Sequence, residues 1–331
     1  MTQLRYATIT GTGSYLPDRV VTNFDLEKMV DTSDEWIRQR TGIAERRIAE
    51  DDVATSDLCI HAARWAIKNA QIDPLDIEMI LVATVTPDRF FPSTACYVQK
   101  GIGAKNAAAM DLSAACAGFL YGLDLADGLV RSGRYNTILV IGGEIFNTIV
   151  DWNDRSTCVL FGDGAGAAVV QATDEPKGIL ASYIGSDGDY ADVDLLGIPA
   201  GGSRMSITQE AIDQKLDKIQ MNGREVFKLG VRLMPEAAQR VLRQADVSIE
   251  DIDLLIPHQA NLRIIEAVGD RLGMPREKVY INVDKYGNTS AATVIIALDE
   301  AIREGRAKPG DLLLFVTFGA GLTWGSTLLR L

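Results

Sequence analysis

The chain has 331 residues, of which 47% are hydrophobic and 24% charged. This composition suits a water-soluble protein with a large core, and the formal net charge of −12 argues against nucleic acid or an anionic membrane as a general partner. No apolar run reaches the ~18 residues that a membrane-spanning helix needs, and the N-terminal segment shows no secretory signal. We therefore expect a cytoplasmic protein.

The cysteines and histidines limit the metal and redox chemistry that the chain can perform. Its four cysteines lie far apart, with no CxxC spacing, which predicts free thiols rather than disulfides or a zinc site. The two histidines, His61 and His258, are too few for a multi-histidine metal site. We expect no metal and no resident cofactor, and we assign no role to His61, which lies within a predicted helix.

Taken in chain order, short apolar runs alternate with helical patterns in two similar series, and such runs indicate parallel strands buried on both faces. The predicted strands are 79–85, 107–112 and 137–142, then 252–256, 279–283 and 312–317. Sliding the sequence along itself places 76–86 on 248–258 and, with the same shift, 122–134 on 294–306. The sequence therefore predicts an α/β layered fold built from two duplicated halves.

Three polar side chains fall where predicted strands end. On the same shift, Cys116 meets Asn288, and Thr86 meets His258. Functional loops of α/β folds lie at the carboxyl ends of strands, so pseudo-twofold symmetry would bring Cys116, His258 and Asn288 together. Taken alone, His258 could be a hydrogen-bonded polar residue at a strand end, and Asn288, which follows a glycine, is typical of an ordinary turn.

Cys116, in the stretch DLSAACAGFLYG, is the candidate nucleophile. A lone cysteine is most often an inert core residue. Here, however, an apolar helix is predicted to begin near Ala117, and the unpaired N–H groups at a helix start favour a thiolate. Glycine costs ~1 kcal/mol relative to alanine inside a helix. Gly118, Gly122 and Gly128 therefore predict close packing of this helix between the halves.

Several motifs together resemble a known family. DLSAACAGF, IPHQANLRII, YGNTSAAT and the terminal FGAGLTWG, with TSDEWIRQRTGI (32–43) and DRSTCVLFGDGAGA (154–167), are similar to β-ketoacyl-acyl-carrier-protein synthase III. This family initiates bacterial type II fatty-acid synthesis. The resemblance implies a homodimer with the thiolase fold, in which two halves form five α-β-α-β-α layers. We place the halves at residues 1–174 and 175–331.

The similarity implies a catalytic triad of Cys116, His258 and Asn288. Cys116 would accept the acyl group of an acyl-CoA primer. His258 and Asn288 would assist the decarboxylation of malonyl-acyl-carrier protein, whose carbanion then attacks the acyl-enzyme. Backbone N–H groups of Cys116 and of Ala320, in the glycine-rich turn 319–321, would form the oxyanion hole. Many relatives have glycine where this chain has Ala320.

The family pattern also assigns residues to binding. The predicted site for CoA and its pantetheine arm consists of Thr32, Trp36, Arg40, Arg155, Phe227, Asn261 and Arg263. Phe91 and Phe318 are assigned to the acyl pocket, where Phe91 would reach across the dimer and favour a short primer. Docking of the carrier protein is assigned to Lys228, Arg263 and Arg271.

Two other functions stay open on the sequence. An acyltransferase of the same fold, from a specialised-metabolite pathway, would use a non-malonyl acceptor and release no CO2. A non-catalytic scaffold that binds acyl-carrier protein would form no adduct on Cys116. Trp36 could likewise be a core residue of its helix. The segment 196–220, whose charged second half predicts an exposed helix, has no assigned role.

Overall fold

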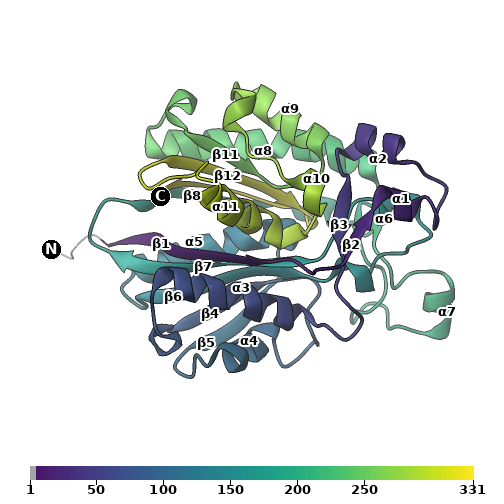
Figure 1. Cartoon of the computed structure of the whole chain (residues 1–331), viewed down its shortest axis with the longest axis horizontal. Coiled ribbons are helices and arrows are strands. Elements are labelled where there is room, and N and C mark those ends of the chain that lie inside the picture. The colour runs from purple at the N-terminus through teal and green to yellow at the C-terminus, as the bar shows by residue number, and fades with distance from the viewer. Residues whose placement is uncertain (1–4) are drawn as a thin grey trace.

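Two sheets stacked face to face organise the protein (Figure 1). The computed structural model describes residues 5–331, so the first four residues of the predicted half 1–174 lie outside the described residues. One sheet has the strand order β1-β7-β6-β4-β5 and the other β11-β12-β13-β8, while β2 pairs with β3 and β9 with β10. The strands are β1 (Tyr6–Tyr15), β2 (Val20–Thr22), β3 (Glu45–Arg47), β4 (Met79–Ala83), β5 (Ala108–Leu112), β6 (Thr137–Glu144), β7 (Gly164–Thr173), β8 (Gly178–Ser186), β9 (Leu196–Gly197), β10 (Gln220–Met221), β11 (Leu254–Pro257), β12 (Leu312–Gly319) and β13 (Thr323–Arg330).

Helices fill the space between the sheets and cover both outer faces (Figure 1). The helices are α1 (Asn23–Leu26), α2 (Asp34–Thr41), α3 (Thr55–Ala70), α4 (Thr94–Ile102), α5 (Gly118–Arg131), α6 (Arg155–Cys158), α7 (Gln209–Asp213), α8 (Gly223–Ala245), α9 (Leu262–Leu272), α10 (Val283–Tyr286) and α11 (Thr293–Arg303). α5 and α11 lie between the sheets, α3 and α4 pack on the first sheet, and α8 and α9 on the second. This order confirms the five predicted α-β-α-β-α layers. In residues 5–331, no helix is both long and apolar enough to cross a bilayer.

The central strands are apolar because helices cover both faces of each sheet. β4, β6 and β12 are buried along their whole length. β4 pairs in parallel with β5 and β6, and β11 in parallel with β12, as the apolar runs predict. β1, β7, β8 and β13 pair antiparallel with their neighbours. Both sheets are therefore mixed. In the second sheet, the short link from β12 to β13 permits only an antiparallel pairing.

The two halves repeat in a register that differs from the predicted one. β12 begins at Leu312 and its counterpart β6 at Thr137, whereas the predicted shift would pair Leu312 with Val140. α11 begins at Thr293 and its counterpart α5 at Gly118, which is the same offset as that between the two strands. The predicted shift is therefore wrong by three residues. This difference is close to one helical turn, so the apolar face of a helix matches nearly as well in either register.

The observed register changes which residues are equivalent in the two halves. Cys116 corresponds to Ala291 rather than to Asn288. His258 follows β11 and corresponds to Ala83, the last residue of β4, rather than to the predicted threonine. Both pairings predicted from the sequence are therefore wrong.

The strand predicted at 279–283 is reduced to one bridge between Val279 and Leu255. A longer strand would pair its next backbone groups with β11. Instead, the Gln259 side chain donates to the Tyr280 carbonyl (3.1 Å) and accepts from the Asn282 N–H (3.0 Å). With both groups satisfied by a side chain, the backbone is free to turn into α10.

α5 begins at Gly118, next to its predicted start, and packs tightly against the first sheet. A Cβ added at Gly118 would lie 2.9 Å from the Ala83 Cβ, and one at Gly122 would lie 2.8 Å from Val140 Cγ1. At Gly128, nothing lies within 4 Å of such an atom. The predicted close packing is therefore confirmed for two of the three glycines.

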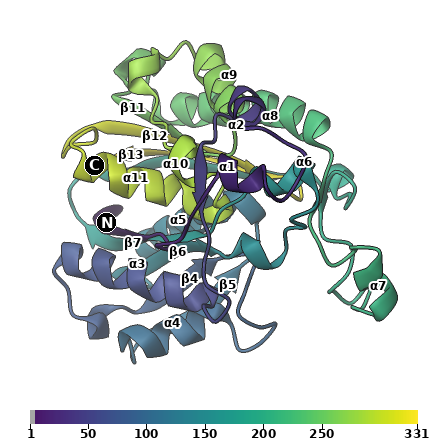
Figure 2. The same ribbon diagram turned by 45° about the vertical axis from the view of Figure 1, so that its right-hand side comes forward.

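The segment 196–220 contains one short helix, α7, rather than a helix over its whole charged half. Thr208 caps its N-terminus, and Lys215, with a φ of +58°, follows its end. α7 projects from the rest of the molecule (Figure 2). The two ends of the segment return to the body, where Leu196 pairs with Met221 between β9 and β10.

Substituting the α5 glycines tests this packing. Gly122→Ala forces a methyl group against the rigid Val140 side chain, and we expect it to lower the free energy of unfolding by about 1–3 kcal/mol. Gly128→Ala is the matched control: its side chain meets open space, and the better helix propensity should raise stability by up to ~1 kcal/mol. Urea denaturation of both variants measures the difference, and equal effects would contradict the packing described.

Candidate active site

Cys116 lies in a sharp turn between a strand and a helix. β5 ends at Leu112, and the 3₁₀ turn Ala115–Ala117 leads into α5. Ala115 has a φ of +46°, which is rare for a residue with a side chain. Such strain persists only where the surroundings hold the backbone in place. The turn leaves Cys116 buried, with 8% of its surface exposed, in the wall of a cavity.

The three residues of the predicted triad line one narrow cavity of about 80 Å³. Cys116, His258 and Asn288 thus come together from three separate parts of the chain. The other lining residues are Leu160, Phe161, Leu196, Met221, Gly223, Val226, Phe227, Met234, Ala260, Asn261, Ile264, Phe318 and Gly319. Because most of these side chains are apolar, the cavity suits an extended, largely apolar chain that ends at a reactive carbonyl.

Asn288 presents its amide N–H group to the cavity. Its backbone N–H donates to the Leu160 carbonyl (2.8 Å), and its carbonyl accepts from the Gly162 N–H (3.1 Å). Its side-chain oxygen, Oδ1, accepts from the Ser290 N–H at 2.8 Å. With Oδ1 occupied, the free group of the carboxamide is Nδ2, a neutral hydrogen-bond donor.

His258 is a neutral imidazole whose tautomer depends on Thr293. The backbone N–H of His258 donates to the Val316 carbonyl (2.8 Å), which fixes the residue at the end of β11. Nδ1 lies 2.7 Å from Thr293 Oγ1, which is also 3.0 Å from the Ser290 carbonyl. When the single hydroxyl proton is donated to the Ser290 carbonyl, Nδ1 carries the ring proton and donates to Thr293; when it is donated to Nδ1, Nε2 carries the ring proton. Burial lowers the pKa of His258 to about 3, so the ring stays uncharged.

The resting thiol of Cys116 is protonated. Burial is the largest influence and raises its pKa to about 12, although a hydrogen bond with the Ser290 side chain opposes this shift. The Glu144 carboxylate acts in the same direction as burial. Burial therefore acts against the thiolate that the helix start is expected to favour, because removing the sulfur from water disfavours its charged form.

The glycine-rich turn 319–321 lies directly against the Cys116 backbone. A Cβ at Gly319 would lie 2.6 Å from Cys116 N, so only glycine fits there. Thr323 Oγ1 donates to the Ala320 carbonyl at 3.1 Å and helps to hold the turn. In residues 5–331, the non-glycine residues with positive φ are Gln71, Ala115, Lys215, Asp246 and Ser290. Ala320 therefore does not need the conformational freedom of glycine.

The predicted adenine site is closed by its own side chains. The Arg155 guanidinium lies 4.9 Å from the centre of the Trp36 ring, and that of Arg40 lies 5.9 Å away. Arg155 also donates to the Asp31 carbonyl at 2.8 Å. Thr32 Oγ1 is buried and has no hydrogen-bond partner. An adenine between Trp36 and Arg155 would have to separate the two stacked side chains.

Asn261 connects this region with the cavity. It caps α9 by accepting from the Arg263 N–H (2.9 Å), and it donates to the Arg40 carbonyl (3.1 Å) in α2. The Arg263 guanidinium lies 5.4 Å from the Phe227 ring centre. Because Phe227 and Asn261 also line the cavity, as does Phe318, they lie between α2 and the Cys116 thiol.

The remaining predicted residues lie outside the cavity. Phe91 is 84% exposed and lines a separate open hollow of about 1180 Å³. Lys228 is exposed on α8 and forms an ion pair with Glu225 (2.7 Å). Arg271 is exposed on α9. Within one protomer, therefore, the structure does not bring Phe91 to the thiol.

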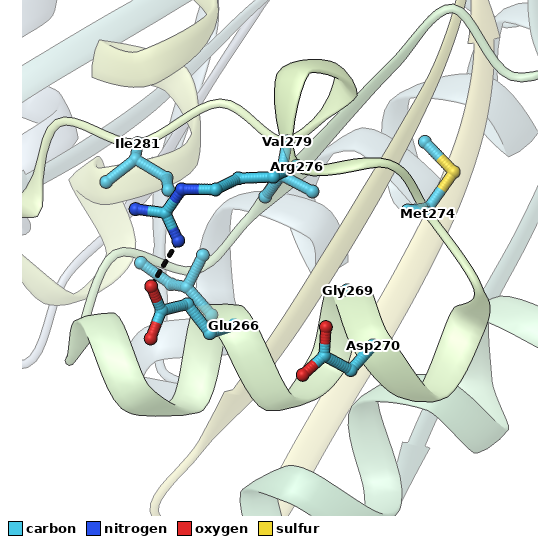
Figure 3. Close-up of a pocket in the computed structure, with 8 residues that line it drawn as sticks. Glu266, Gly269, Asp270, Met274, Arg276, Val279 and Ile281 are labelled. Atoms are coloured by element: carbon cyan, nitrogen blue, oxygen red, sulfur yellow. Dashed lines mark hydrogen bonds and ion pairs between the residues drawn. The ribbon is translucent and has the colours of Figure 1, made fainter.

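A further pocket, of about 260 Å³, lies against α9 and the segment that follows it (Figure 3). Its residues are Ile265, Glu266, Gly269, Asp270, Met274, Arg276, Val279 and Ile281. Glu266 and Arg276 form an ion pair across it (Figure 3). None of these residues was predicted to bind a substrate, and we assign the pocket no part in the site.

Sequence analysis missed the polar residues behind the triad. Glu144, Ser290 and Thr293 are buried and hydrogen-bonded around Cys116 and His258. Glu144 ends the otherwise apolar run TILVIGGE, and an acid that closes a buried strand is a signal that could have been noticed. Ser290 and Thr293 lie inside a quoted motif, but a motif alone does not show which hydroxyl groups face the site.

A duplicated five-layered fold with a buried cysteine beside a neutral histidine and an asparagine defines a class, the thiol-dependent acyltransferases. The comparison with known families specifies it further. The family model 3-Oxoacyl-[acyl-carrier-protein (ACP)] synthase III matches residues 110–188, and the model of its C-terminal part matches residues 242–331. The chain belongs to this family of condensing acyltransferases.

Close relatives extend over nearly the whole chain. The β-ketoacyl-[acyl-carrier-protein] synthase III of Caldanaerobacter subterraneus subsp. tengcongensis is 57% identical and covers 98% of this chain and 97% of its own. The crystal structure of 3-oxoacyl-[acyl-carrier-protein] synthase III from Aquifex aeolicus VF5 is 49% identical, covers 98% and 100%, and has a TM-score of 0.91. The priming β-ketosynthase of the R1128 polyketide pathway is 36% identical, covers 100% and 98%, and has a TM-score of 0.92.

The raised pKa of the thiol can be tested by alkylation. Because burial holds the pKa of Cys116 at about 12, its thiolate fraction and its reaction rate with iodoacetamide should increase about tenfold per pH unit from about pH 7 to pH 10. Mass spectrometry of the Cys116 peptide measures the rate, and Cys116→Ala, which retains the other three thiols, is the control. A plateau near pH 7 would show that the resting thiol is already ionised.

Proposed function

We propose that this chain condenses an acyl-CoA primer with malonyl-acyl-carrier protein, yielding β-ketoacyl-acyl-carrier protein, CoA and CO2. This reaction would initiate type II fatty-acid synthesis, and we place it in the cytoplasm. The observation that carries the proposal is the single cavity lined by Cys116, His258 and Asn288. The printed names of the close relatives support the choice of substrates.

In the first half-reaction, the Cys116 sulfur attacks the thioester carbonyl of the primer, and CoA leaves. The negative oxygen of the tetrahedral intermediate needs two donors, which we assign to the backbone N–H groups of Cys116 and Ala320. The close contact of Gly319 with Cys116 N supports this assignment because it places the two segments side by side.

In the second half-reaction, malonyl-acyl-carrier protein loses CO2, and negative charge develops on its thioester oxygen. Asn288 Nδ2 can donate to this oxygen, and His258 can donate through Nε2 when Thr293 gives its hydroxyl proton to Nδ1 rather than to the Ser290 carbonyl; neither group carries a charge. We therefore propose that the reaction needs no metal or resident cofactor. The carbanion then attacks the acyl group on Cys116, which releases the product.

We assign the path of the CoA primer to the residues between α2 and the cavity. Trp36 and Arg155 would part to hold the adenine between an indole and a guanidinium plane. The unpartnered hydroxyl of Thr32 and the exposed Arg40 would contact the same nucleotide. The pantetheine arm would then pass Phe227, Asn261 and Arg263 toward the thiol.

The carrier protein would dock beside the same entrance. Arg224, Lys228 and Arg232 lie four residues apart on the exposed side of α8, with Arg263 and Arg271 on the neighbouring α9. These side chains form a local positive surface on a chain of net charge −12. We assign docking to Lys228, Arg263 and Arg271, as the sequence predicts.

We also propose a homodimer. Phe90 and Phe91 are 86% and 84% exposed at the edge of the open hollow, and Ile207 beside them is 57% exposed. Large apolar side chains grouped in this way favour a protein interface. Across such an interface, Phe91 of one protomer would close the acyl pocket of the other and favour a short primer.

Adduct formation and CO2 release test the function together. Mass spectrometry with acyl-CoAs of increasing length should show an acyl group on Cys116 that is absent from Cys116→Ala. With malonyl-acyl-carrier protein, His258→Ala and Asn288→Ala should each lower the rate of CO2 release by about 10²–10³-fold, because one donor to the developing charge is lost. Adduct without CO2 release would indicate the specialised-metabolite acyltransferase, and no adduct would indicate a scaffold.

The adenine site is tested by comparing two tryptophans. Trp36→Ala should raise the KM for acyl-CoA by about 10–100-fold with little change in kcat, because stacking on a base is worth ~1–3 kcal/mol. Trp65→Ala removes an indole that is 49% exposed on α3 and should leave KM unchanged. An unchanged KM in Trp36→Ala would contradict the adenine site and indicate that Trp36 has a purely structural role.

A further inference from the structure

Glu144 is a carboxylate buried at the end of β6, behind the turn that carries Cys116. One oxygen, Oε2, accepts from the hydroxyls of Thr84 (3.1 Å) and Thr86 (2.7 Å) and from the Thr86 N–H (3.1 Å). The other oxygen, Oε1, accepts from the Ser290 hydroxyl at 3.1 Å. Each of these partners is an uncharged hydrogen-bond donor.

Ser290 connects this carboxylate with the reactive sulfur. Its fully buried hydroxyl donates to Glu144 Oε1, which leaves a lone pair of Oγ for the S–H of the Cys116 thiol, whose pKa the Ser290 side chain lowers. The two 3₁₀ turns that carry these residues, 115–117 and 290–292, pack against each other. Ser290 Oγ therefore lies between the sulfur and a carboxylate, where a hydroxyl can pass a proton from one to the other.

We propose that Ser290 relays the proton of the Cys116 thiol to Glu144 while Cys116 attacks the primer. This inference rests on the proposed function. Ser290 touches the reacting sulfur and takes a catalytic role, whereas Glu144 acts through it as a positioning residue that stores the proton. The S–H proton moves to Ser290 Oγ, and the hydroxyl proton of Ser290 moves to Glu144 Oε1.

The proton balance closes over the whole cycle. As the S–C bond to the acyl group forms and the bond to CoA breaks, Glu144 becomes protonated, and CoA leaves as a thiolate that takes a proton from water. When condensation later breaks the bond between Cys116 and the acyl group, the released thiolate regains its proton from Glu144 through Ser290. The enzyme returns to its starting state, and the proton consumed is the one that CoA takes up.

Burial favours Glu144 over His258 as the proton store. Transfer to His258 would create an imidazolium beside the developing charge, and burial opposes this by lowering the pKa of His258 to about 3. Transfer to Glu144 neutralises a charge that is already buried, and burial raises the pKa of this carboxyl to about 7. Near neutral pH, Glu144 can therefore both accept a proton and return it.

Among the groups around Glu144, Asp163 also titrates close to neutral pH. From α3 and from the turn 115–117, it faces the thiols of Cys59 and Cys116, whose pKa values are raised by burial. The segment after β4 and the turn 290–292 contribute only hydroxyl and N–H groups. Burial raises the pKa of Asp163, which precedes β7, to about 6, but this carboxylate is bonded to the backbone N–H groups of Ala49 and Asn147 rather than to Ser290.

Single-turnover acylation tests the relay. Glu144→Gln and Ser290→Ala should each slow acylation of Cys116 by acetyl-CoA by about 10²-fold or more, since the acceptor or the link is lost. Ser290→Ala keeps the backbone N–H that holds Asn288. Thr84→Val is the matched control: it removes a hydroxyl that is also 3.1 Å from Glu144 but does not reach the sulfur, and its acylation rate should stay within about threefold.

A pH profile separates proton transfer from simple structural support. In the unmodified enzyme, the acylation rate should increase with pH through about 7 and then level, because Glu144 must be ionised to accept a proton. Glu144→Gln should lose this inflection. Thr84→Val should move it to higher pH, because the Thr84 hydrogen bond lowers the pKa of Glu144.

Decarboxylation provides the remaining control. In a Cys116→Ala background no acylation occurs, and adding Glu144→Gln or Ser290→Ala should change CO2 release from malonyl-acyl-carrier protein by less than about threefold. Three results would each overturn the relay. The first is an equal loss of acylation in Ser290→Ala and Thr84→Val, and the second is unchanged acylation in Glu144→Gln. The third is a loss of CO2 release in the double variants that matches the loss of acylation in the single variants. If the unmodified enzyme forms no acyl-Cys116, the proposed function itself fails.

Discussion

Burial of the thiol between two stacked sheets is the constraint on which the chemistry depends. It raises the pKa of Cys116 to about 12, lowers that of His258 to about 3 and raises that of Glu144 to about 7. All three shifts have desolvation as their largest cause and favour the uncharged form of each group. A buried site of this kind disfavours charged side chains. Stabilisation of a negative oxygen must therefore come from uncharged hydrogen-bond donors, and a proton is most easily accepted by a group that already carries a negative charge.

Close backbone contacts make such a site possible. Gly319 approaches Cys116 N so closely that a Cβ would lie at 2.6 Å, and a Cβ on Gly142 would lie 2.4 Å from the Ala291 carbonyl. These contacts join the two halves through backbone atoms, whose positions vary less than those of side chains. The N–H groups near the sulfur are thereby fixed before a substrate arrives, which is the preorganisation that stabilises an oxyanion.

The sequence predicted the layers, and it predicted that Cys116, His258 and Asn288 come together at one cavity, because apolar periodicity and motifs are local properties of the chain. The register of the repeat was wrong, because an error close to one helical turn nearly preserves a helical face. The strand at 279–283 was wrong because the Gln259 side chain, distant in sequence, satisfies its backbone groups. The connection between Ser290 and Glu144 spans 146 residues, and no local pattern indicates a hydrogen bond over such a separation.

The duplication explains how a thiol and a hydroxyl come to lie side by side in this site. In the observed register of the repeat, Ala115 and Ser290 are equivalent, and both have positive φ, +46° and +49°. Each begins a 3₁₀ turn that leads into a central helix, α5 or α11. The fold therefore builds the same strained turn twice and packs the copies together. In one copy, the residue after the strained position is Cys116, the proposed nucleophile; in the other, the strained residue, Ser290, itself carries a hydroxyl. Pseudo-symmetry brings the two turns into contact, and their different side chains give one a thiol and the other a hydroxyl.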